Sequence, residues 1–181
     1  MDFESKITSR EISQLLWERE MTLGTAESCT GGRVAEAIIA VPGASKYFKG
    51  GIVSYADEIK ERILGVDRQL IEEKTAVCED IAVAMVKGAC KALNTDYAIA
   101  VTGIAGPGGG TAERPVGTIW LACGNEDNVA TCQLTEDKGR DKNLSEATHT
   151  ALEMFLEFLK GEEKVSEDDV EPQGEVKWGS N

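Results

Sequence analysis

A chain of 181 residues, 41% hydrophobic and 28% charged, has the composition of one globular domain and is long enough to bury about two-thirds of its unfolded surface. Its formal net charge of −13 disfavours nucleic acid as a partner, because phosphate backbones are bound by clustered basic residues. No apolar run approaches the ~20 residues that span a bilayer, and the N-terminus lacks a signal-peptide layout, so we expect a cytoplasmic protein without membrane contact.

Apolar residues recur at helical or strand spacing along the chain and predict helices that alternate with strands. A capping-box pattern at Thr8-Ser-Arg-Glu11 predicts the start of the first helix. The continuous apolar run 97–102 predicts a buried central strand, and two later strands predict a hairpin at the sheet edge. In chain order we expect helix 8–20, strand 21–27, helix 34–39, strand 50–55, helix 57–64, helix 79–93, strand 97–102, strands 117–123 and 129–134, and helix 144–159.

This alternation predicts an α/β fold, a three-layer α/β/α sandwich around a mainly parallel, mixed sheet. Ligands of such sheets bind at the carboxyl ends of strands, where Ser28, Tyr55 and Thr102 are expected. The acidic composition after residue 160 predicts a domain of residues 1–160 and a solvated tail of residues 161–181, with docking of Trp178 onto the domain as the alternative.

The cysteines and the histidine offer little for metal or disulfide chemistry. The five cysteines are odd in number and form no Cys-x-x-Cys pair, which predicts reduced thiols rather than disulfides or a zinc site. The single histidine, His149, is expected among apolar residues of the last helix. That setting favours a packed or solvated histidine over a member of a Ser-His-Asp triad.

Ser28 is expected where the first strand turns into a helix, followed by Thr30, Gly31 and Gly32. A hydroxyl at such a turn can be exposed, and N–H groups at a helix N-terminus can hold an oxyanion or a phosphate. The structural alternative is that Ser28 or Thr30 only caps the helix. Cys29 is a rival nucleophile, because a helix N-terminus depresses a thiol pKa. Adjacent residues usually point in different directions, so one of the two is expected to face the cleft.

Lys60 is the candidate base, because a lysine held in a cleft can lose its proton near neutral pH and activate a serine. It lies on the expected helix 57–64 beside a face formed by Ile59 and Ile63, and Tyr55 precedes it at a strand end. Tyr55 is a candidate to relay the proton or orient a substrate. The alternative is a surface lysine and an ordinary strand aromatic.

A glycine-rich segment, residues 103–110, follows the expected central strand. It matches neither Gly-x-Gly-x-x-Gly nor the Gly-Lys-Ser/Thr ending of a phosphate loop. It is therefore a candidate nest for a single phosphate rather than a nucleotide-binding fingerprint.

Three motifs taken together resemble the CinA C-terminal domain family: Thr-Ala-Glu-Ser-Cys-Thr-Gly-Gly at 25–32, Gly-Gly-Ile-Val-Ser-Tyr at 50–55 with Lys60 and Leu-Gly-Val at 64–66, and Val-Thr-Gly-Ile-Ala-Gly-Pro at 101–107 with Pro-Val-Gly-Thr at 115–118. The resemblance covers roughly residues 8–160 and implies an α/β/α fold. For the stand-alone form of the family it implies conversion of nicotinamide mononucleotide into nicotinate mononucleotide and ammonia, in pyridine-nucleotide salvage, without a metal or cofactor. It also implies a homo-oligomer.

Carried over residue by residue, the resemblance implies that Ser28 is the nucleophile, Lys60 the base and Tyr55 its partner. The implied substrate-binding residues are Glu27, Cys29, Thr30, Gly31, Gly32, Thr102, Gly103, Ile104, Ala105 and Gly106, with Arg140 as a phosphate contact.

This sequence departs from the family pattern in three places. Leu144 stands where family members often carry an arginine, which bears on phosphate binding or oligomer contacts, Cys78 stands at a position before the long helix that is commonly serine, and the acidic tail after Gly161 has no counterpart in the family pattern. Because of Leu144 and the tail, a module that binds a pyridine nucleotide without turnover stays open as the alternative function.

Overall fold

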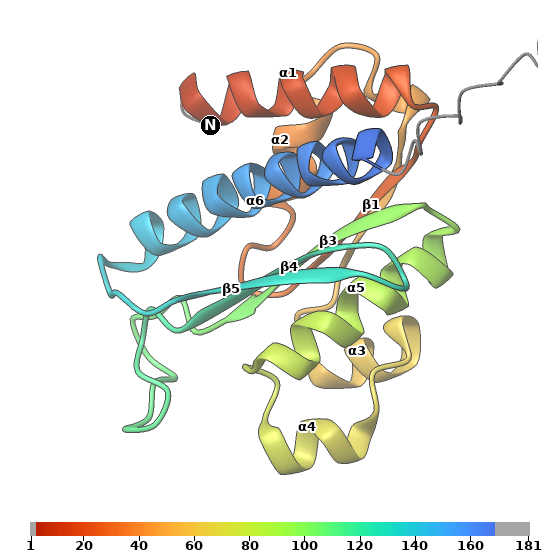
Figure 1. Ribbon diagram of the computed structural model, residues 1–181. Helices are drawn as coiled ribbons and strands as arrows, with labels where there is room; N and C mark the ends of the chain where they lie inside the picture. The colour runs from red at the N-terminus through yellow and green to blue at the C-terminus, as the bar shows by residue number, and fades with distance from the viewer. Residues whose placement is uncertain (1–2, 169–181) are drawn as a thin grey trace, which may run out of the picture.

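The computed structural model describes the backbone of residues 3–168 and the side chains of residues 4–162. A five-stranded sheet in the order β2-β1-β3-β4-β5 forms the middle layer (Figure 1). Its strands are β1 (Leu23–Glu27), β2 (Phe48–Val53), β3 (Tyr97–Gly103), β4 (Ile119–Gly124) and β5 (Val129–Leu134). Strand β1 pairs in parallel with β2 and β3, whereas the β3–β4 and β4–β5 pairings are antiparallel. The predicted three-layer fold with a mixed sheet is confirmed, including the buried central strand and the edge hairpin.

Helices cover both faces of the sheet (Figure 1). One face carries α1 (Phe3–Glu18), α2 (Arg33–Ile39) and α6 (Arg140–Asp168), and the other carries α3 (Asp57–Leu64), α4 (Arg68–Lys74) and α5 (Glu79–Leu93). A short 3-10 helix, η1 (Ala44–Lys46), precedes β2.

The side chains of strand β3 differ in size between the two faces of the sheet. Ile99 and Val101 belong to the core under α1, α2 and α6, whereas Ala98 and Ala100 belong to the core under α5. Successive side chains of a strand point to opposite faces, so a bulky residue alternates here with an alanine. The small side chains leave room for α5 to pack closely on the sheet.

The first helix begins earlier than its sequence pattern predicts. Helix α1 starts at Phe3, so Thr8 lies within it and donates its hydroxyl to the Glu4 carbonyl oxygen at 3.2 Å. The predicted capping box is therefore wrong. Thr8 is only 7% exposed, and its burial within the fold outweighs the local capping preference.

The remaining boundaries differ mainly around α4 and α6. Helices α3 and α5 have the predicted bounds, but α4 was not predicted. Helix α6 continues to Asp168, so the expected boundary after residue 160 falls inside a helix. Trp178 lies outside the described residues.

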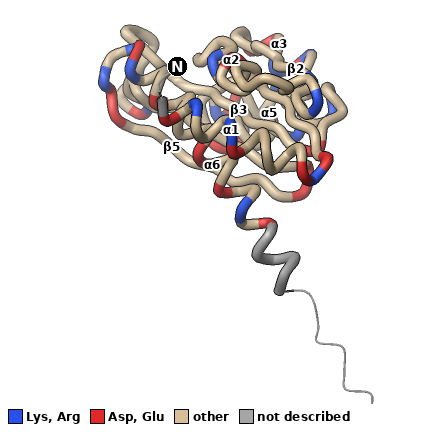
Figure 2. Tube along the Cα trace, turned by 90° about the horizontal axis from the view of Figure 1, so that it is seen from above, with Lys and Arg blue, Asp and Glu red and all other residues tan. Residues whose placement is uncertain are grey.

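Charged residues of both signs are distributed around the periphery of the domain (Figure 2). None of the helices found between residues 3 and 168 combines the length and the hydropathy that a membrane-spanning helix requires.

Candidate active site

The carboxyl ends of three neighbouring strands meet at one edge of the sheet, because β2, β1 and β3 run in parallel. Backbone hydrogen bonds extend this pairing one residue past β1 and β2: the Ser28 N–H donates to the Val101 carbonyl, and the Ser54 N–H donates to the Glu27 carbonyl, both at 2.8 Å. Ser28 and Ser54 are thus held by the sheet itself. The site is built on a rigid frame.

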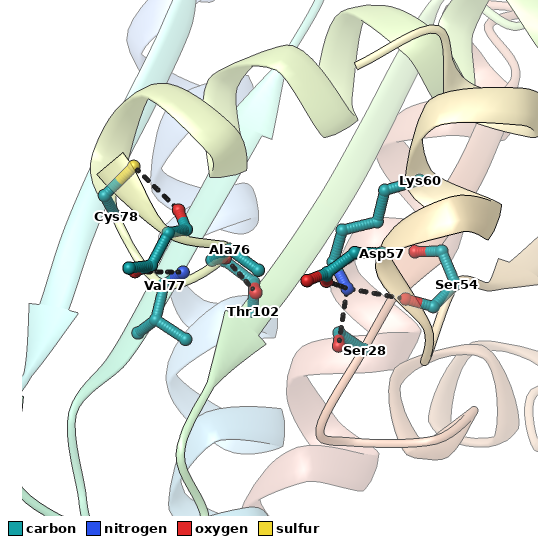
Figure 3. Close-up of polar contacts among 9 residues, drawn as sticks. Ser28, Ser54, Asp57, Lys60, Ala76, Val77, Cys78 and Thr102 are labelled. Carbon is teal, nitrogen blue, oxygen red and sulfur yellow. Dashed lines mark hydrogen bonds and ion pairs between the residues drawn. The ribbon is translucent and has the colours of Figure 1, made fainter. Parts of the chain in front are cut away.

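Lys60 extends from α3 toward Ser28, as the sequence predicts (Figure 3). It is 1% exposed and lies on the buried face of the helix together with Leu64, whereas Ile63 is 43% exposed. The face that Ile59 and Ile63 share is thus not the buried face of α3. A buried amine is tolerated only where oxygen atoms surround it, which is the case here.

Three oxygens lie within hydrogen-bond distance of Lys60 Nζ: Ser28 Oγ at 3.3 Å, the Ser54 carbonyl at 2.9 Å and Asp57 Oδ1 at 3.2 Å. The carbonyl and the carboxylate can only accept hydrogen bonds, whereas a serine hydroxyl can also donate. In the structure Lys60 Nζ donates to all three oxygens and forms an ion pair with Asp57. Once the amine has given up one proton, its two hydrogens can stay on Ser54 and Asp57, and its lone pair can accept the Ser28 hydroxyl proton. The arrangement can remove a proton from Ser28.

Glu27 binds the N-terminus of α2 rather than facing the cleft. Its carboxylate is 1% exposed and accepts hydrogen bonds from the backbone N–H groups of Gly32, Val34 and Ala35 at 2.9–3.0 Å. A carboxylate is favoured there by the helix dipole and by the unpaired N–H groups of the first turn. These amides are consequently occupied, which corrects the expectation that they hold an oxyanion. Neither Ser28 nor Thr30 caps the helix.

The turn after Ser28 leaves two other backbone donors. The Gly31 N–H donates to the Ser28 carbonyl at 3.1 Å, whereas the Cys29 and Thr30 N–H groups lie beside the Cys29 thiol, whose pKa they lower. Gly31 and Gly32 have φ values of 60° and 104°, a left-handed region that favours glycine. The glycines shape the turn, and the Cys29 and Thr30 amides remain as candidate oxyanion donors.

Cys29 is a poor rival to Ser28 as a nucleophile. Its side chain is 7% exposed and packs in the core under α1, α2 and α6. Burial raises the pKa of this thiol to about 12, so it stays protonated at neutral pH. The nearby N-terminus of α2 does not offset the effect of burial on the pKa of this thiol.

A cleft of about 280 Å³ opens beside Ser28 and Lys60. Most of the sequence-predicted site residues border it, whereas Glu27, Thr30, Gly31 and Gly32 do not. The lining comprises Ser28, Cys29, Tyr55, Asp57, Lys60, Ala76, Val77, Thr102, Gly103, Ile104, Ala105, Gly106, Gly108, Gly109 and Arg140. Tyr55 is 62% exposed and is not one of the three hydrogen-bond partners of Lys60 Nζ, so its place is at the rim.

Asp57, Ala76 and Val77 were missed by the sequence reasoning. Asp57 precedes Lys60 by three residues on one helix, a spacing that places two side chains together and could have revealed it. The segment of Ala76 and Val77 reaches the cleft only through the tertiary fold, where the Ala76 carbonyl accepts a hydrogen bond from the Thr102 hydroxyl at 2.7 Å. No local sequence pattern predicts such a contact.

Arg140 begins α6 and contacts the glycine-rich segment 103–110. Its guanidinium donates to the Gly106 carbonyl at 2.7 Å and lines the cleft. Leu144, one turn later, is 4% exposed and packs in the core instead. Arg140 thus supplies positive charge to the cleft, while Leu144 does not border it.

The single histidine lies at the contact of α1 with α6. His149 Nδ1 is 3.2 Å from Ser5 Oγ, and Nε2 is 3.2 Å from Glu153 Oε1. It does not line the cleft. In the part of the chain that the structure describes, no group of three or more His, Cys, Asp or Glu side chains is placed to hold a metal ion.

Comparison with curated proteins finds relatives across most of the chain. The chain is 47% identical over 151 residues to a CinA-like protein of Leptospira interrogans, covering 83% of this chain and 36% of the relative. It is 49% identical over 117 residues to a CinA-like protein of Leptospira borgpetersenii, covering 65% and 28%. The chain thus spans about a third of the length of these relatives.

Solved structures match over nearly their whole length. The competence/damage inducible protein CihA from Agrobacterium tumefaciens has a TM-score of 0.84 at 36% identity, covering 88% of this chain and 98% of that chain. A competence-damaged protein (CinA) superfamily protein from Escherichia coli has a TM-score of 0.81 at 32% identity, covering 88% and 92%. Residues 5–159 match the family model described as CinA C-terminal domain, and the chain belongs to that family.

Proposed function

We propose that this protein is an amidohydrolase that converts nicotinamide mononucleotide into nicotinate mononucleotide and ammonia. The observation that carries the proposal is the buried Lys60 amine, 3.3 Å from the Ser28 hydroxyl at the edge of a cleft. A nucleophile, a base and a group that orients the base form the arrangement expected for nucleophilic catalysis. The substrate follows from the motifs shared with the stand-alone members of the family.

In the proposed reaction Ser28 Oγ attacks the carboxamide carbon while Lys60 Nζ removes the hydroxyl proton. The carbonyl oxygen gains negative charge, and the backbone N–H groups of Cys29 and Thr30, in the turn after Ser28, are the candidates to stabilise it. Lys60 then gives its proton to the amide nitrogen, the C–N bond breaks, and ammonia leaves. Water, activated by the same lysine, hydrolyses the ester on Ser28.

The remaining cleft residues support a substrate with an apolar ring and an anionic end. Ala76 and Val77 offer an apolar wall, and Arg140 offers a guanidinium that can bind a phosphate. The glycine-rich loop between them has φ values of 87° at Gly106 and 88° at Gly109, which allow close approach of its backbone. These features suit a nucleotide amide.

Arg140→Ala is expected to raise the KM for nicotinamide mononucleotide by about tenfold or more, because a charge-assisted contact to phosphate is lost. The KM for nicotinamide riboside, which lacks the phosphate, is expected to change little. Lys142→Ala, which removes a neighbouring exposed cation on α6, is the matched control. Equal effects on both substrates would contradict a phosphate contact.

The proposal is tested by incubating the purified full chain with nicotinamide mononucleotide and measuring both products. Ammonia and nicotinate mononucleotide are expected in equal amounts. Calorimetric binding of the nucleotide with no ammonia would overturn the proposal and would support the binding module without turnover.

A further inference from the structure

We infer that Thr102 is a positioning residue that holds the segment 75–78 as one wall of the cleft and thereby sets the affinity for the substrate ring. The kinetic part of this inference rests on the proposed function. Thr102 acts through the Ala76 carbonyl, which takes the hydroxyl proton, so that proton is not donated to a substrate.

The contact joins the end of the central strand to the connection between α4 and α5. Thr102 is 1% exposed, and its hydroxyl donates to the Ala76 carbonyl at 2.7 Å (Figure 3). Ala76 and Val77 line the same cleft as Ser28 and Lys60. A shift of this segment therefore moves the cleft wall relative to the nucleophile.

The backbone of the segment needs such support. Thr75 has a φ of 65°, in the left-handed region that β-branched residues rarely adopt. Such a conformation persists when surrounding contacts fix it. The segment therefore depends on external contacts.

Two further contacts hold the segment from outside. The Arg114 guanidinium donates to the Lys74 carbonyl at 3.0 Å, and Lys74 pairs with Asp80. Both contacts are exposed, and both involve Lys74, which precedes the segment. Thr102 supplies a buried hydrogen bond to the segment, and Ala76 and Cys78 also pack against the core under α5.

The wall suits an amide attached to a ring. Ala76 and Val77 present aliphatic side chains, which suit the face of an aromatic ring better than a polar chain. The carboxamide carbon is attached directly to that ring, so the position of the wall determines how close the carbon lies to Ser28 Oγ. Small misplacements of this kind reduce productive binding.

Cys78 provides a reporter for the position of the wall that does not depend on activity. It is half-buried at the end of the segment, with Sγ 3.6 Å from the Thr75 carbonyl. Cys29, Cys90 and Cys123 are buried, and the other half-buried thiol, Cys132, is removed by Cys132→Ser. In that background the rate of alkylation by iodoacetamide follows Cys78.

Thr102→Val keeps the side-chain shape and removes the donor. Loss of one hydrogen bond is expected to raise the rate of Cys78 alkylation, and the KM for nicotinamide mononucleotide, by about three- to tenfold, with a smaller change in kcat. Thr102→Ser keeps a hydroxyl and is expected to restore both values. Parental alkylation and KM in Thr102→Val, or no rescue by Thr102→Ser, would overturn the inference.

Two measures keep the test decisive. If no protein releases ammonia, the proposed function fails, and the alkylation rate with the dissociation constant for nicotinamide mononucleotide still decides the role of Thr102. If Thr102→Val does not fold, Thr102→Ala removes the same donor with a smaller side chain. It is expected to raise Cys78 alkylation in the same direction, and an unchanged rate would contradict a wall held by this bond.

Discussion

At Lys60 Nζ, two of the three neighbouring oxygens can only accept hydrogen bonds, and this decides where a lone pair can point. The Ser54 carbonyl belongs to the backbone beyond β2 and is fixed by the sheet. The Asp57 carboxylate is 52% exposed, so it is the orienting group that can be changed without disturbing the core. Asp57 thus tests how far the orientation of Lys60 matters.

Asp57→Ala is expected to lower kcat by about three- to tenfold, the effect of one lost hydrogen bond, with little change in KM. The reason is that the amine is held by one fixed acceptor instead of two. Steady-state ammonia release measures both constants.

Glu58→Ala is the matched control, because Glu58 also lies in the first turn of α3 and carries the same charge. It does not contact Lys60 Nζ. An equal loss of kcat in both variants would mean that the loss comes from removing a negative charge near the N-terminus of α3. It would contradict a role of Asp57 in orienting Lys60.

A site residue can be predicted from sequence when its side-chain type suits the chemistry and a recognisable turn or motif marks its position. Ser28 and Lys60 were predicted because a strand-to-helix turn and a family motif mark them. Glu27 was placed with the substrate because the sequence does not show which way a carboxylate at the end of β1 points. The Ser54 carbonyl could not be predicted from side-chain types, because every residue carries one.

At the scale of single elements, the short helix α2 depends on its N-terminal contacts. It has seven residues, and isolated helices of that length are unstable in water. The Glu27 carboxylate accepts three of its first N–H groups. Since Ser28 lies between Glu27 and α2, this cap also fixes the turn that presents the nucleophile.

Glu27→Gln is expected to lower the free energy of unfolding by about 1–2 kcal/mol, because the charge at the helix N-terminus and one strong acceptor are lost. Urea denaturation at neutral pH measures the change. Glu36→Gln, at an exposed position of the same helix, controls for the loss of charge alone. A similar destabilisation by both substitutions would contradict a specific cap.

The helices differ in how well they could be predicted from their sequences. Helices α3 and α5 begin with acidic residues and have buried residues on one side, so their bounds were predicted. Helix α4 has seven residues, and its only buried residue is Ile71, so no apolar periodicity reveals it. Its start is marked by Asp67, whose side chain accepts from the Gln69 N–H, but one capping residue is too common a signal to predict a helix.

At the scale of the whole molecule, two cores lie on opposite faces of the sheet and both contain buried thiols. Cys29 and Cys123 belong to one core and Cys90 to the other. Burial raises the pKa of Cys29 and Cys123 to about 12 and that of Cys90 to about 11, from an ordinary value of 9.0. The folded protein therefore keeps protons that the unfolded chain releases.

This difference predicts that the free energy of unfolding falls as the pH rises from 9 toward 12. The unfolded state binds fewer protons in this range, so the slope is negative, and the full stability of these thiols is present below pH 9. Denaturation with urea at several pH values measures the slope. Cys123→Ala is expected to make it shallower, and an unchanged slope would contradict a contribution from this thiol.

The arrangement of whole layers was predictable, but one contact across them was not. The alternation of helices and strands predicted the three-layer fold, because each element has only a few ways to bury its apolar side. Glu162 of α6 accepts a hydrogen bond from the Tyr97 hydroxyl at 2.6 Å, although the residues are 65 positions apart. The acidic composition after residue 160 did not indicate that this carboxylate contacts the sheet.

The central claim is that Ser28, and not its neighbour Cys29, attacks the amide. Its most direct test compares ammonia release from nicotinamide mononucleotide by the parent protein, Ser28→Ala and Cys29→Ala. Alanine is chosen because a buried cysteine packs like a small apolar residue. Ser28→Ala is expected to lower kcat by at least about a thousandfold, whereas Cys29→Ala keeps most of the parental rate. Parental ammonia release by Ser28→Ala, or loss of activity in Cys29→Ala alone, would contradict it.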